Sequence, residues 1–234
     1  MKNETDGGED RIGTYLDRID ADRPLRRAIR RAQKVARAEG ILDGLRAAMG
    51  PTSVFVDCGA HYGETTLAVA DSGAQIHSFE PDPANWLHLT AACGHLPNVT
   101  LHNAAVAKED GSITIYGSSR YADKESWRSS GSSTIADNTS INQSDAHEVR
   151  AISLLGFLRH LIEKHGRITI LKMDIEGAEV EILEQLIATD IFNHINLTLV
   201  ETHRWLFPNM RDRYAALYDF ADKNPDRNLY LQWI

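Results

Sequence analysis

The chain has 234 residues, 42% of them hydrophobic, which is enough for one domain with a buried core and a short addition. Its formal net charge of −8 argues against a general nucleic-acid-binding protein, because phosphate contacts need a basic surplus. Cys58 and Cys93 form neither a disulfide framework nor a metal knuckle, and no apolar stretch is long enough for a signal peptide or a membrane span. We therefore expect a cytoplasmic protein with no nucleic-acid partner and no membrane span.

Residues 1–50 are expected to form a polar tail followed by a basic helical extension. Apolar residues recur at helical spacing over 25–36, Gly40 is a stop signal, and a second short helix is expected over 41–49. Residues 23–37 hold seven basic residues and no acidic one. We expect a covering helix with solvated charges. The alternative is a contact with an anionic substrate or partner.

From Pro51 onward, apolar runs typical of strands alternate with segments of helical spacing. This alternation predicts a doubly wound, mostly parallel sheet with helices on both faces, an α/β fold of the Rossmann-like class, over residues 51–234. The expected strands are 53–56, 75–79, 99–102, 168–173 and 197–200, and the expected helices are 65–70, 86–93, 154–164 and 180–187.

An insertion at about 112–150 interrupts this alternation. Ile113, Ile115 and residues 147–152 predict an added antiparallel pair, and the serine-rich residues 117–144 between them are too poor in aliphatic side chains to build a core. This stretch is either disordered or a lid over the substrate. The apolar residues 229–234 are either the last strand of the sheet or an interface between copies of the chain in a homo-oligomer.

The first strand ends in Asp57 and continues into a glycine-containing turn that opens a helix. Ligands of doubly wound sheets bind outside the carboxyl ends of the strands, where this turn lies. Gly59 is expected to let the backbone approach a ligand closely, and Gly63 to allow tight packing of the helix start. The expected cofactor contacts in the turn are Asp57, Gly59, Ala60, His61, Tyr62 and Gly63.

The composition of this turn favours S-adenosylmethionine over a nicotinamide dinucleotide. A dinucleotide site needs a Gly-x-Gly-x-x-Gly turn that faces pyrophosphate, but His61 stands in the place of the second glycine. Asp57 would repel a phosphate, whereas S-adenosylmethionine carries an ammonium and a sulfonium and no phosphate. Asp57 is therefore expected near the α-amino group of the cofactor, either directly or through the hydrogen bonds of the turn.

Further cofactor contacts are expected at the ends of the next two strands. Glu80, followed by Pro81, ends the second strand and is placed to accept hydrogen bonds from both ribose hydroxyls. Asn103 and Ala104 follow the third strand, where the adenine ring is expected.

Four blocks of the sequence resemble the FkbM family of methyltransferases. They are residues 56–63 (Val-Asp-Cys-Gly-Ala-His-Tyr-Gly), 79–81 (Phe-Glu-Pro), 171–179 (Leu-Lys-Met-Asp-Ile-Glu-Gly-Ala-Glu) and 199–203 (Leu-Val-Glu-Thr-His). The resemblance covers about residues 53–205. It implies transfer of a methyl group from S-adenosylmethionine, typically to oxygen on a sugar or a secondary metabolite.

The expected catalytic residues follow the fourth and fifth strands. Asp174 ends the fourth strand, and Glu201 and His203 follow the fifth, so all three should open onto the crevice that holds the cofactor's methyl group. Asp174 is also expected to border the cofactor. A hydroxyl nucleophile must lose its proton during transfer. His203 is the preferred general base, because an unperturbed histidine has a pKa of about 6.5.

Asp174, Glu201 and His203 form an alternative metal site for Mg²⁺ or Mn²⁺, which would polarise the acceptor. Asp174 has a structural alternative as the cap of the following helix. Glu176 and Glu179 are expected to stabilise the start of that helix, where carboxylates favour the helix dipole. Lys172 is expected to neutralise Asp174.

The leading interpretation is an O-methyltransferase with a small hydroxylated acceptor. Methylation of a macromolecule, either RNA or protein, is an alternative that rests only on the basic helix. A non-catalytic module that binds the cofactor is a third hypothesis, and the intact set of Asp57, Glu80, Asp174 and His203 argues against it. Nothing in the sequence identifies the acceptor.

Overall fold

A computed structural model of the chain describes residues 23–118 and 141–233. The chain divides into two units, residues 1–41 and 42–233. Helix α2 (Arg23–Ala48) runs through Gly40, so the prediction that Gly40 ends a helix is wrong. Glycine inside a helix costs only about 1 kcal/mol relative to alanine, and good helix formers lie on both sides of it. The expected polar tail, residues 1–22, lies outside the described residues.

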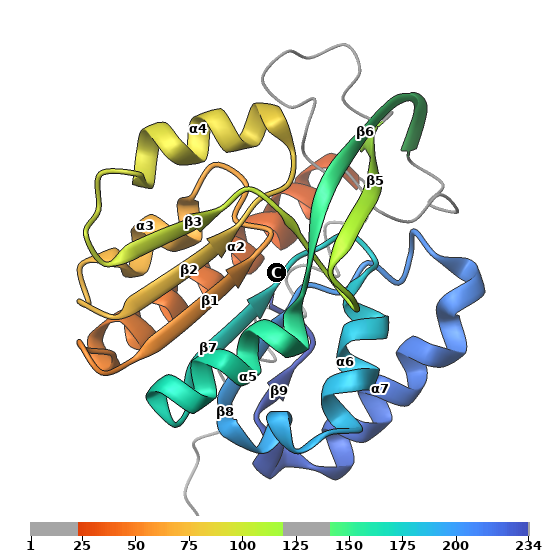
Figure 1. The fold of residues 1–234 in the computed structure, drawn as a ribbon. Helices are drawn as coiled ribbons and strands as arrows, with labels where there is room; N and C mark the ends of the chain where they lie inside the picture. The colour runs from red at the N-terminus through yellow and green to blue at the C-terminus, as the bar shows by residue number, and fades with distance from the viewer. Residues whose placement is uncertain (1–22, 119–140, 234) are drawn as a thin grey trace, which may run out of the picture. The chain divides into compact units, whose positions relative to one another are not determined.

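Six parallel strands form the central sheet in the order β3-β2-β1-β7-β8-β9 (Figure 1). All five predicted strands are present, and the apolar segment near the C-terminus adds a sixth at the edge beside β8. The strands are β1 (Val54–Cys58), β2 (Gln75–Phe79), β3 (Val99–His102), β7 (Ile168–Met173), β8 (Ile195–Val200) and β9 (Leu229–Tyr230).

The sheet winds in opposite directions from its middle. From β1 the chain moves outward through β2 to β3, and from β7 it moves the other way through β8 to β9. Because crossovers between parallel strands are right-handed, this reversal places the helices of the two halves on opposite faces, which confirms the doubly wound prediction. The helices in order are α3 (Glu64–Ala70), α4 (Pro83–Cys93), α5 (Leu154–His165), α6 (Glu179–Ile187) and α7 (Arg211–Lys223), with short 3₁₀ turns η2 (Asp190–His194), η3 (Pro208–Met210) and η4 (Pro225–Arg227).

A second, three-stranded sheet has the order β4-β6-β5. Strands β5 (Gly111–Ser118) and β6 (Ile141–Ser153) are antiparallel, as predicted, and β4 (Ala105–Ala107) joins β6 in parallel. In Figure 1 this pair rises beside the carboxyl ends of the central strands. Residues 119–140, most of the stretch interpreted as a lid or as disorder, lie outside the described residues.

The largest apolar cluster joins the central strands to α5, α6 and α7. It includes Val54, Val56 and Cys58, which alternate along β1 and are fully buried. A smaller cluster forms around Leu89 and Cys93 of α4. The strands read as continuous apolar runs because a parallel sheet is covered on both faces, which leaves polar side chains to gather at the strand ends.

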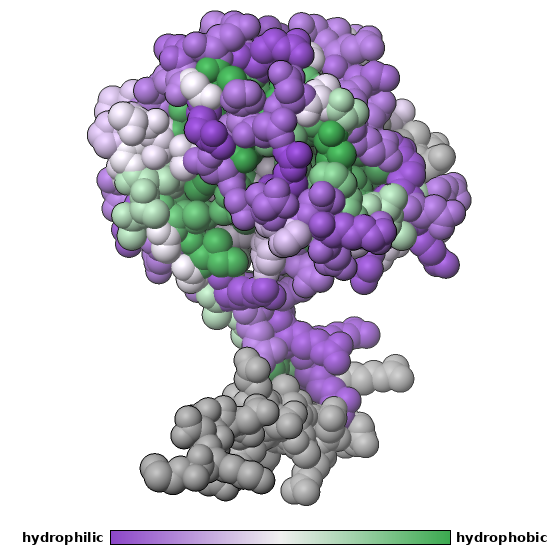
Figure 2. Space-filling view, turned by 90° about the horizontal axis from the view of Figure 1, so that it is seen from below, coloured by the Kyte–Doolittle hydropathy of each residue, from purple (hydrophilic) through white to green (hydrophobic). Residues whose placement is uncertain are grey.

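None of the helices in the described ranges combines the length and apolar content needed to cross a membrane. The face shown in Figure 2 is mostly hydrophilic where the residues are described, with smaller hydrophobic areas between the polar ones.

His77 on β2 makes the stability of the fold depend on pH. Burial, together with the positive charges of His102, His165 and Lys164, lowers the pKa of His77 to about 4. The unfolded chain binds this proton below about pH 6.5, so the folded state loses stability as the pH falls from about 6.5 to about 4.

We expect His77→Gln to reduce the loss of unfolding free energy between pH 7 and pH 4.5, measured by denaturant titration. The exposed His160, changed to glutamine, is the control, and equal pH slopes for wild type and His77→Gln would contradict the assignment.

Candidate active site

The candidate site lies where β1 and β7 end side by side, at the point where the direction of winding reverses. Asp57 on β1 and Lys172 on β7 are register partners in these neighbouring parallel strands. Asp174 follows β7 directly, and Glu201 and His203 follow β8. The carboxyl ends of parallel strands at such a point form the usual ligand crevice of an open α/β sheet.

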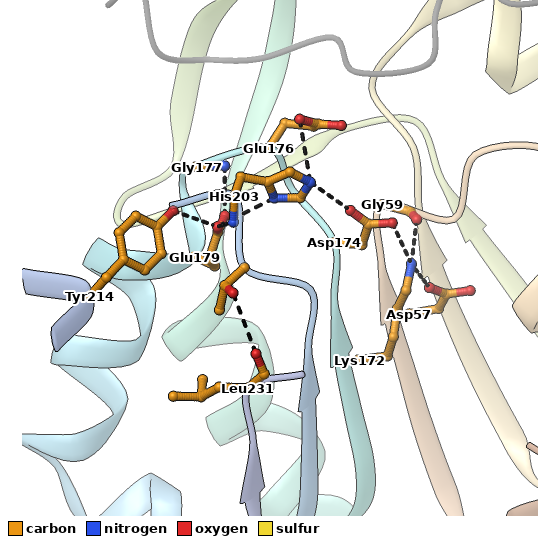
Figure 3. Close-up of polar contacts among 11 residues, drawn as sticks. Asp57, Gly59, Lys172, Asp174, Glu176, Gly177, Glu179, His203, Tyr214 and Leu231 are labelled. Carbon is orange, nitrogen blue, oxygen red and sulfur yellow. Dashed lines mark hydrogen bonds and ion pairs between the residues drawn. The ribbon is translucent and has the colours of Figure 1, made fainter. Parts of the chain in front are cut away.

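A buried ion pair joins the two strands. The Nζ atom of Lys172 lies 3.1 Å from Oδ1 of Asp57, and both side chains are almost completely buried. The same Nζ donates a 2.6 Å hydrogen bond to the carbonyl oxygen of Gly59, and it lies 3.9 Å from Asp174 (Figure 3). Thr66 of α3 donates to the other oxygen of Asp57 at 2.9 Å. Burial alone would lower the pKa of Lys172, but the charges of Asp57 and Asp174 and the hydrogen bond to Asp57 together outweigh it and raise that pKa.

Lys172 therefore acts differently from the expectation. Lys172 was expected to neutralise Asp174, but its close partner is Asp57. Asp57 is fully buried, and the ammonium of Lys172 that pairs with it also holds the carbonyl of Gly59. Its role at the cofactor, direct or through the hydrogen bonds of the turn, stays a prediction.

Gly59 and Gly63 of the turn must be glycines, because other protein atoms occupy the space that a Cβ atom would need. Gly59 has φ +79°, and a Cβ atom at this position would lie 1.9 Å from the carbonyl oxygen of Asp174. The backbone at Gly59 is thus pressed against the end of β7, whereas the sequence suggested close approach to a ligand. Gly63 has φ +94°, and its Cβ would lie 2.7 Å from Sγ of Cys93 on α4, which confirms the expected tight packing of the helix start.

Glu80 lies after β2 and is held by donors of the chain itself. One oxygen accepts from the backbone N–H of His61 at 2.8 Å, and the other accepts from the N–H of Asp82 at 2.9 Å and from Asn85 at 3.3 Å. Burial raises the pKa of Glu80 to about 7, against the effect of these hydrogen bonds. A carboxylate offers about four acceptor positions, so three donors leave about one for a ligand. Glu80 thus couples the end of β2 to the cofactor turn.

The other residues expected at the cofactor line the same edge. Tyr62 is stacked on His61, with ring centroids 3.9 Å apart, and also contacts His88 at 4.6 Å. Ala60 is buried and its N–H donates to the carbonyl of Phe79. Pro81 and Asn103 are accessible after β2 and β3, whereas Ala104 is buried.

His203 is surrounded by three carboxylates. Its Nε2 atom lies 3.4 Å from Glu176 and 3.6 Å from Asp174, and its Nδ1 atom lies 3.4 Å from Glu179 (Figure 3). The residue is only 4% exposed. Burial alone would lower the pKa of His203, but the contacts with Glu179, Glu176 and Asp174 outweigh it and raise the pKa to about 10.

Glu179, at the first position of α6, holds this arrangement in place. It is fully buried, and its carboxylate accepts from the backbone N–H groups of Gly177 and His203 and from the Tyr214 hydroxyl, at 2.6, 3.1 and 2.8 Å. Burial alone would raise the pKa of Glu179, but His203 outweighs it and lowers that pKa. Glu179 therefore has the expected role at the helix start and also orients the imidazole.

Two expectations about the carboxylates of this cluster are corrected, whereas the role of His203 as the general base stays a prediction. The raised pKa of His203 means that the surrounding carboxylates favour the protonated imidazole. Asp174 does not cap α6, whose N-cap is Ala178. Glu176 does not serve the helix dipole; it precedes α6 with φ 52°, in the left-handed region, and faces His203.

The cluster that could hold a metal ion also differs from the predicted one. Within the described residues, the group with ligand atoms all within 4.8 Å of one another is Asp174, Glu176 and His203. Glu201 lies outside that group. Burial and the charge of Asp174 raise the pKa of Glu201 to about 7.

The roles of Glu176 and Lys172 were underestimated from the sequence, because their partners belong to distant segments. Lys172 pairs with Asp57 of β1, and Glu176 faces His203, which follows β8. The signal available was the density of charge in residues 172–179, where one lysine and three acids follow an apolar strand. Such density at the end of a buried strand indicates charges that are paired in the tertiary structure.

Comparison with known proteins supports one family. The protein-family model described as the methyltransferase FkbM domain matches residues 57–221. No curated protein sequence matches the chain.

Two solved structures are similar to parts of the chain. A methyltransferase FkbM from Methylobacillus flagellatus KT is 18% identical over 63% of this chain, with a TM-score of 0.38, and the match spans 33% of that protein's length. The 1,6-didemethyltoxoflavin-N1-methyltransferase of Burkholderia thailandensis, solved with 1,6-didemethyltoxoflavin and S-adenosylhomocysteine bound, is 11% identical over 72% of this chain and 83% of its own, with a TM-score of 0.23.

Removing one partner of the buried ion pair should be costly. We expect Lys172→Met to lower the free energy of unfolding by about 3–5 kcal/mol, because Asp57 would remain buried without a counter-charge. The matched control is Lys108→Met, which removes an exposed pair with Glu181 (3.7 Å) and should cost at most about 1 kcal/mol. Denaturant unfolding of both variants measures the difference. Equal losses would show that the Asp57–Lys172 contact does not stabilise the fold.

Proposed function

The chain belongs to the FkbM methyltransferase family, and we propose that it transfers a methyl group from S-adenosylmethionine to a hydroxyl oxygen of a small molecule, a sugar or a secondary metabolite. The observation that carries this proposal is the placement of two polar groups at one edge of the sheet. The first group is the turn after β1, with Asp57 and Gly59, to which Glu80 is hydrogen-bonded through His61. The second is the cluster of Asp174, Glu176 and His203, which follows the neighbouring strands β7 and β8.

The turn fits a cationic cofactor without phosphate. Asp57 and Glu80 place two buried carboxyl groups beneath it, of which Asp57 is paired with Lys172. Helix α3 begins with Glu64, whose negative charge in the first turn would repel a phosphate at that position. When bound, S-adenosylmethionine would supply an activated methyl group on a sulfonium.

The chain's own residues must then position the acceptor hydroxyl and take up its proton. Asp174 is 30% exposed at the end of β7, so its carboxylate is accessible to an acceptor. His203 is fixed by Glu179 and presents Nε2 to the same space. A carboxylate of the cluster can accept the proton itself, or the cluster can bind a divalent cation that makes the hydroxyl more acidic. Asp174, Glu176 and His203 would be the ligands of such a cation.

A cytoplasmic location is part of the proposal. Cys58 and Cys93 are both free and buried, which suits a reducing compartment.

Cofactor binding is the first test. We expect calorimetry to show binding of S-adenosylmethionine and S-adenosylhomocysteine, and Glu80→Gln to weaken it by about 1–3 kcal/mol through the loss of charged acceptor positions at the turn. Glu163→Gln, at an exposed carboxylate of α5, is the control and should bind normally. A wild-type protein that bound neither compound would overturn the proposed function, and an unchanged Glu80→Gln would remove Glu80 from the cofactor site.

The metal alternative has a separate test. We expect Mn²⁺ binding, followed by electron paramagnetic resonance, to be weakened at least about tenfold by Glu176→Gln and much less by Glu201→Gln, because Glu176 lies in the ligand group and Glu201 does not. A larger loss of Mn²⁺ affinity in Glu201→Gln than in Glu176→Gln would instead support Asp174, Glu201 and His203 as the metal ligands. No Mn²⁺ binding by the wild type, with transfer unaffected by EDTA, would assign the proton to a carboxylate of the cluster.

A further inference from the structure

A pocket of about 620 Å³ lies beside the reactive cluster, between the segment that follows β8 and one face of α7. The residues of its lining that bear on ligand chemistry are Arg204, Trp205, Arg211, Tyr218, Asp219 and Asp222. The described contacts of the cofactor turn involve none of these residues, so the pocket is separate from the turn at Asp57 and Gly59.

The pocket is connected to His203 through two aromatic residues. Trp205 follows His203 by two positions, and its ring centroid lies 5.7 Å from that of the imidazole. Tyr214, which also lines the pocket, donates its hydroxyl hydrogen to Glu179, the residue that orients His203. The wall of the pocket is therefore linked to His203 through Trp205 directly and through Tyr214 and Glu179.

Trp205 offers a flat apolar surface for a ring. The side chain is 54% exposed, although burial of a tryptophan is among the largest apolar gains available to a chain. A pocket with an aromatic wall and a few placed polar groups is the usual form of a small-molecule site. The C–H face of a sugar ring stacks on such a wall while its hydroxyls stay free for hydrogen bonds.

The pocket holds charges of both signs along α7. Arg211 is the first residue of α7, and Arg204 lies over the ring of Tyr218, 5.5 Å from its centroid, two turns later. Asp219 is paired with Lys223 at 2.7 Å. Neither arginine has a carboxylate within ion-pair distance among the described residues. Asp219 and Asp222 lie at least two turns further along the helix, about 12 Å or more from Arg211 at 1.5 Å per residue.

The start of α7 reinforces the positive end. Its N-cap, Met210, contributes no side-chain hydrogen bond, and the backbone N–H of Arg211 donates to the carbonyl of Pro208. The helix dipole favours an anion at this position. Arginine also matches the planar oxygens of a carboxylate or a phosphate better than lysine does.

We propose that this pocket is the acceptor subsite, and that it takes a hydroxylated ring bearing a carboxylate or a phosphate. The ring stacks on Trp205, Arg204 and Arg211 supply the positive charge for the anionic group, and Asp222 accepts hydrogen bonds from hydroxyls. The proposal rests on the proposed function, since it places the methylated hydroxyl beside His203.

The test is equilibrium binding of three probes, D-glucuronate, D-glucose 6-phosphate and D-glucose, to the full chain with and without S-adenosylhomocysteine. Quenching of tryptophan fluorescence and calorimetry provide the readouts. We expect at least one anionic probe to bind about tenfold or more tightly than glucose, with an affinity that falls as salt rises. Binding of glucuronate alone would identify a carboxylate, and binding of glucose 6-phosphate alone a phosphate.

The variants assign the contacts. Arg204→Gln and Arg211→Gln should each reduce the preference for the anionic probe about tenfold, and Trp205→Leu should weaken all probes and remove the quenching. Arg213→Gln is the matched control, because Arg213 lies on the same helix, pairs with Glu184 and does not line this pocket. All four residues are at least partly exposed, so the variants should fold.

Several outcomes would overturn the subsite. They are equal binding of glucose and both anions, no binding of any probe, or a loss in Arg213→Gln equal to that in Arg204→Gln. If the wild-type chain bound the probes but not S-adenosylhomocysteine, that result would contradict the proposed function and leave the assignment of the pocket unchanged.

Discussion

The buried pair of Asp57 and Lys172 is the constraint on which the site depends. It joins the two strands between which the direction of winding reverses, and the same ammonium holds the carbonyl of Gly59. Two charges in a fully buried position are tolerated only when they are paired and hydrogen-bonded. The absence of a Cβ atom at Gly59 then lets the turn close against the backbone of Asp174. The cofactor turn and the reactive strand end are therefore fixed relative to each other by one set of contacts.

The reactive end of the sheet holds more negative than positive charge. Asp174, Glu176, Glu179 and Glu201 lie around His203, and the elevated pKa of His203 follows from that excess. A site of this kind gains from any added positive charge, whether that of a sulfonium, a divalent cation or a proton on the imidazole. Glu179 differs from the other acids because its oxygens are already committed to Gly177, His203 and Tyr214. It sets the position of the imidazole and leaves Asp174 and Glu176 to face a ligand.

The segment between β8 and α7 contributes residues both to the cluster around His203 and to the neighbouring pocket. Within a few residues it places His203 beside the cofactor edge, Trp205 on the wall of the neighbouring pocket and Arg211 at the start of a helix. Tyr214 links the pocket wall to Glu179, so the side that would hold an acceptor also supports the imidazole. A shift of this segment would move both groups together, which favours keeping an acceptor hydroxyl and His203 in register.

The sequence by itself determined the five central strands, the helices that follow them and the parallel sheet, and it located the glycine turn after the first strand, because apolar periodicity and strand-end glycines are local signals. It also brought Asp174 and His203 to one edge of the sheet, since strand ends meet there in any doubly wound fold. The tertiary structure decided which charges pair. Lys172 pairs most closely with Asp57, and Glu176, not Glu201, lies with Asp174 and His203 in the possible ligand group. The backbone of Gly59 packs against that of Asp174. These contacts join segments about 25 to 115 residues apart in the sequence. Helix α7 was not foreseen either, although Tyr214, Leu217, Tyr218 and Ala221 recur at helical spacing and pack against the core. Charge pairing and helix docking depend on distances in space, and those exist only once the sheet has formed.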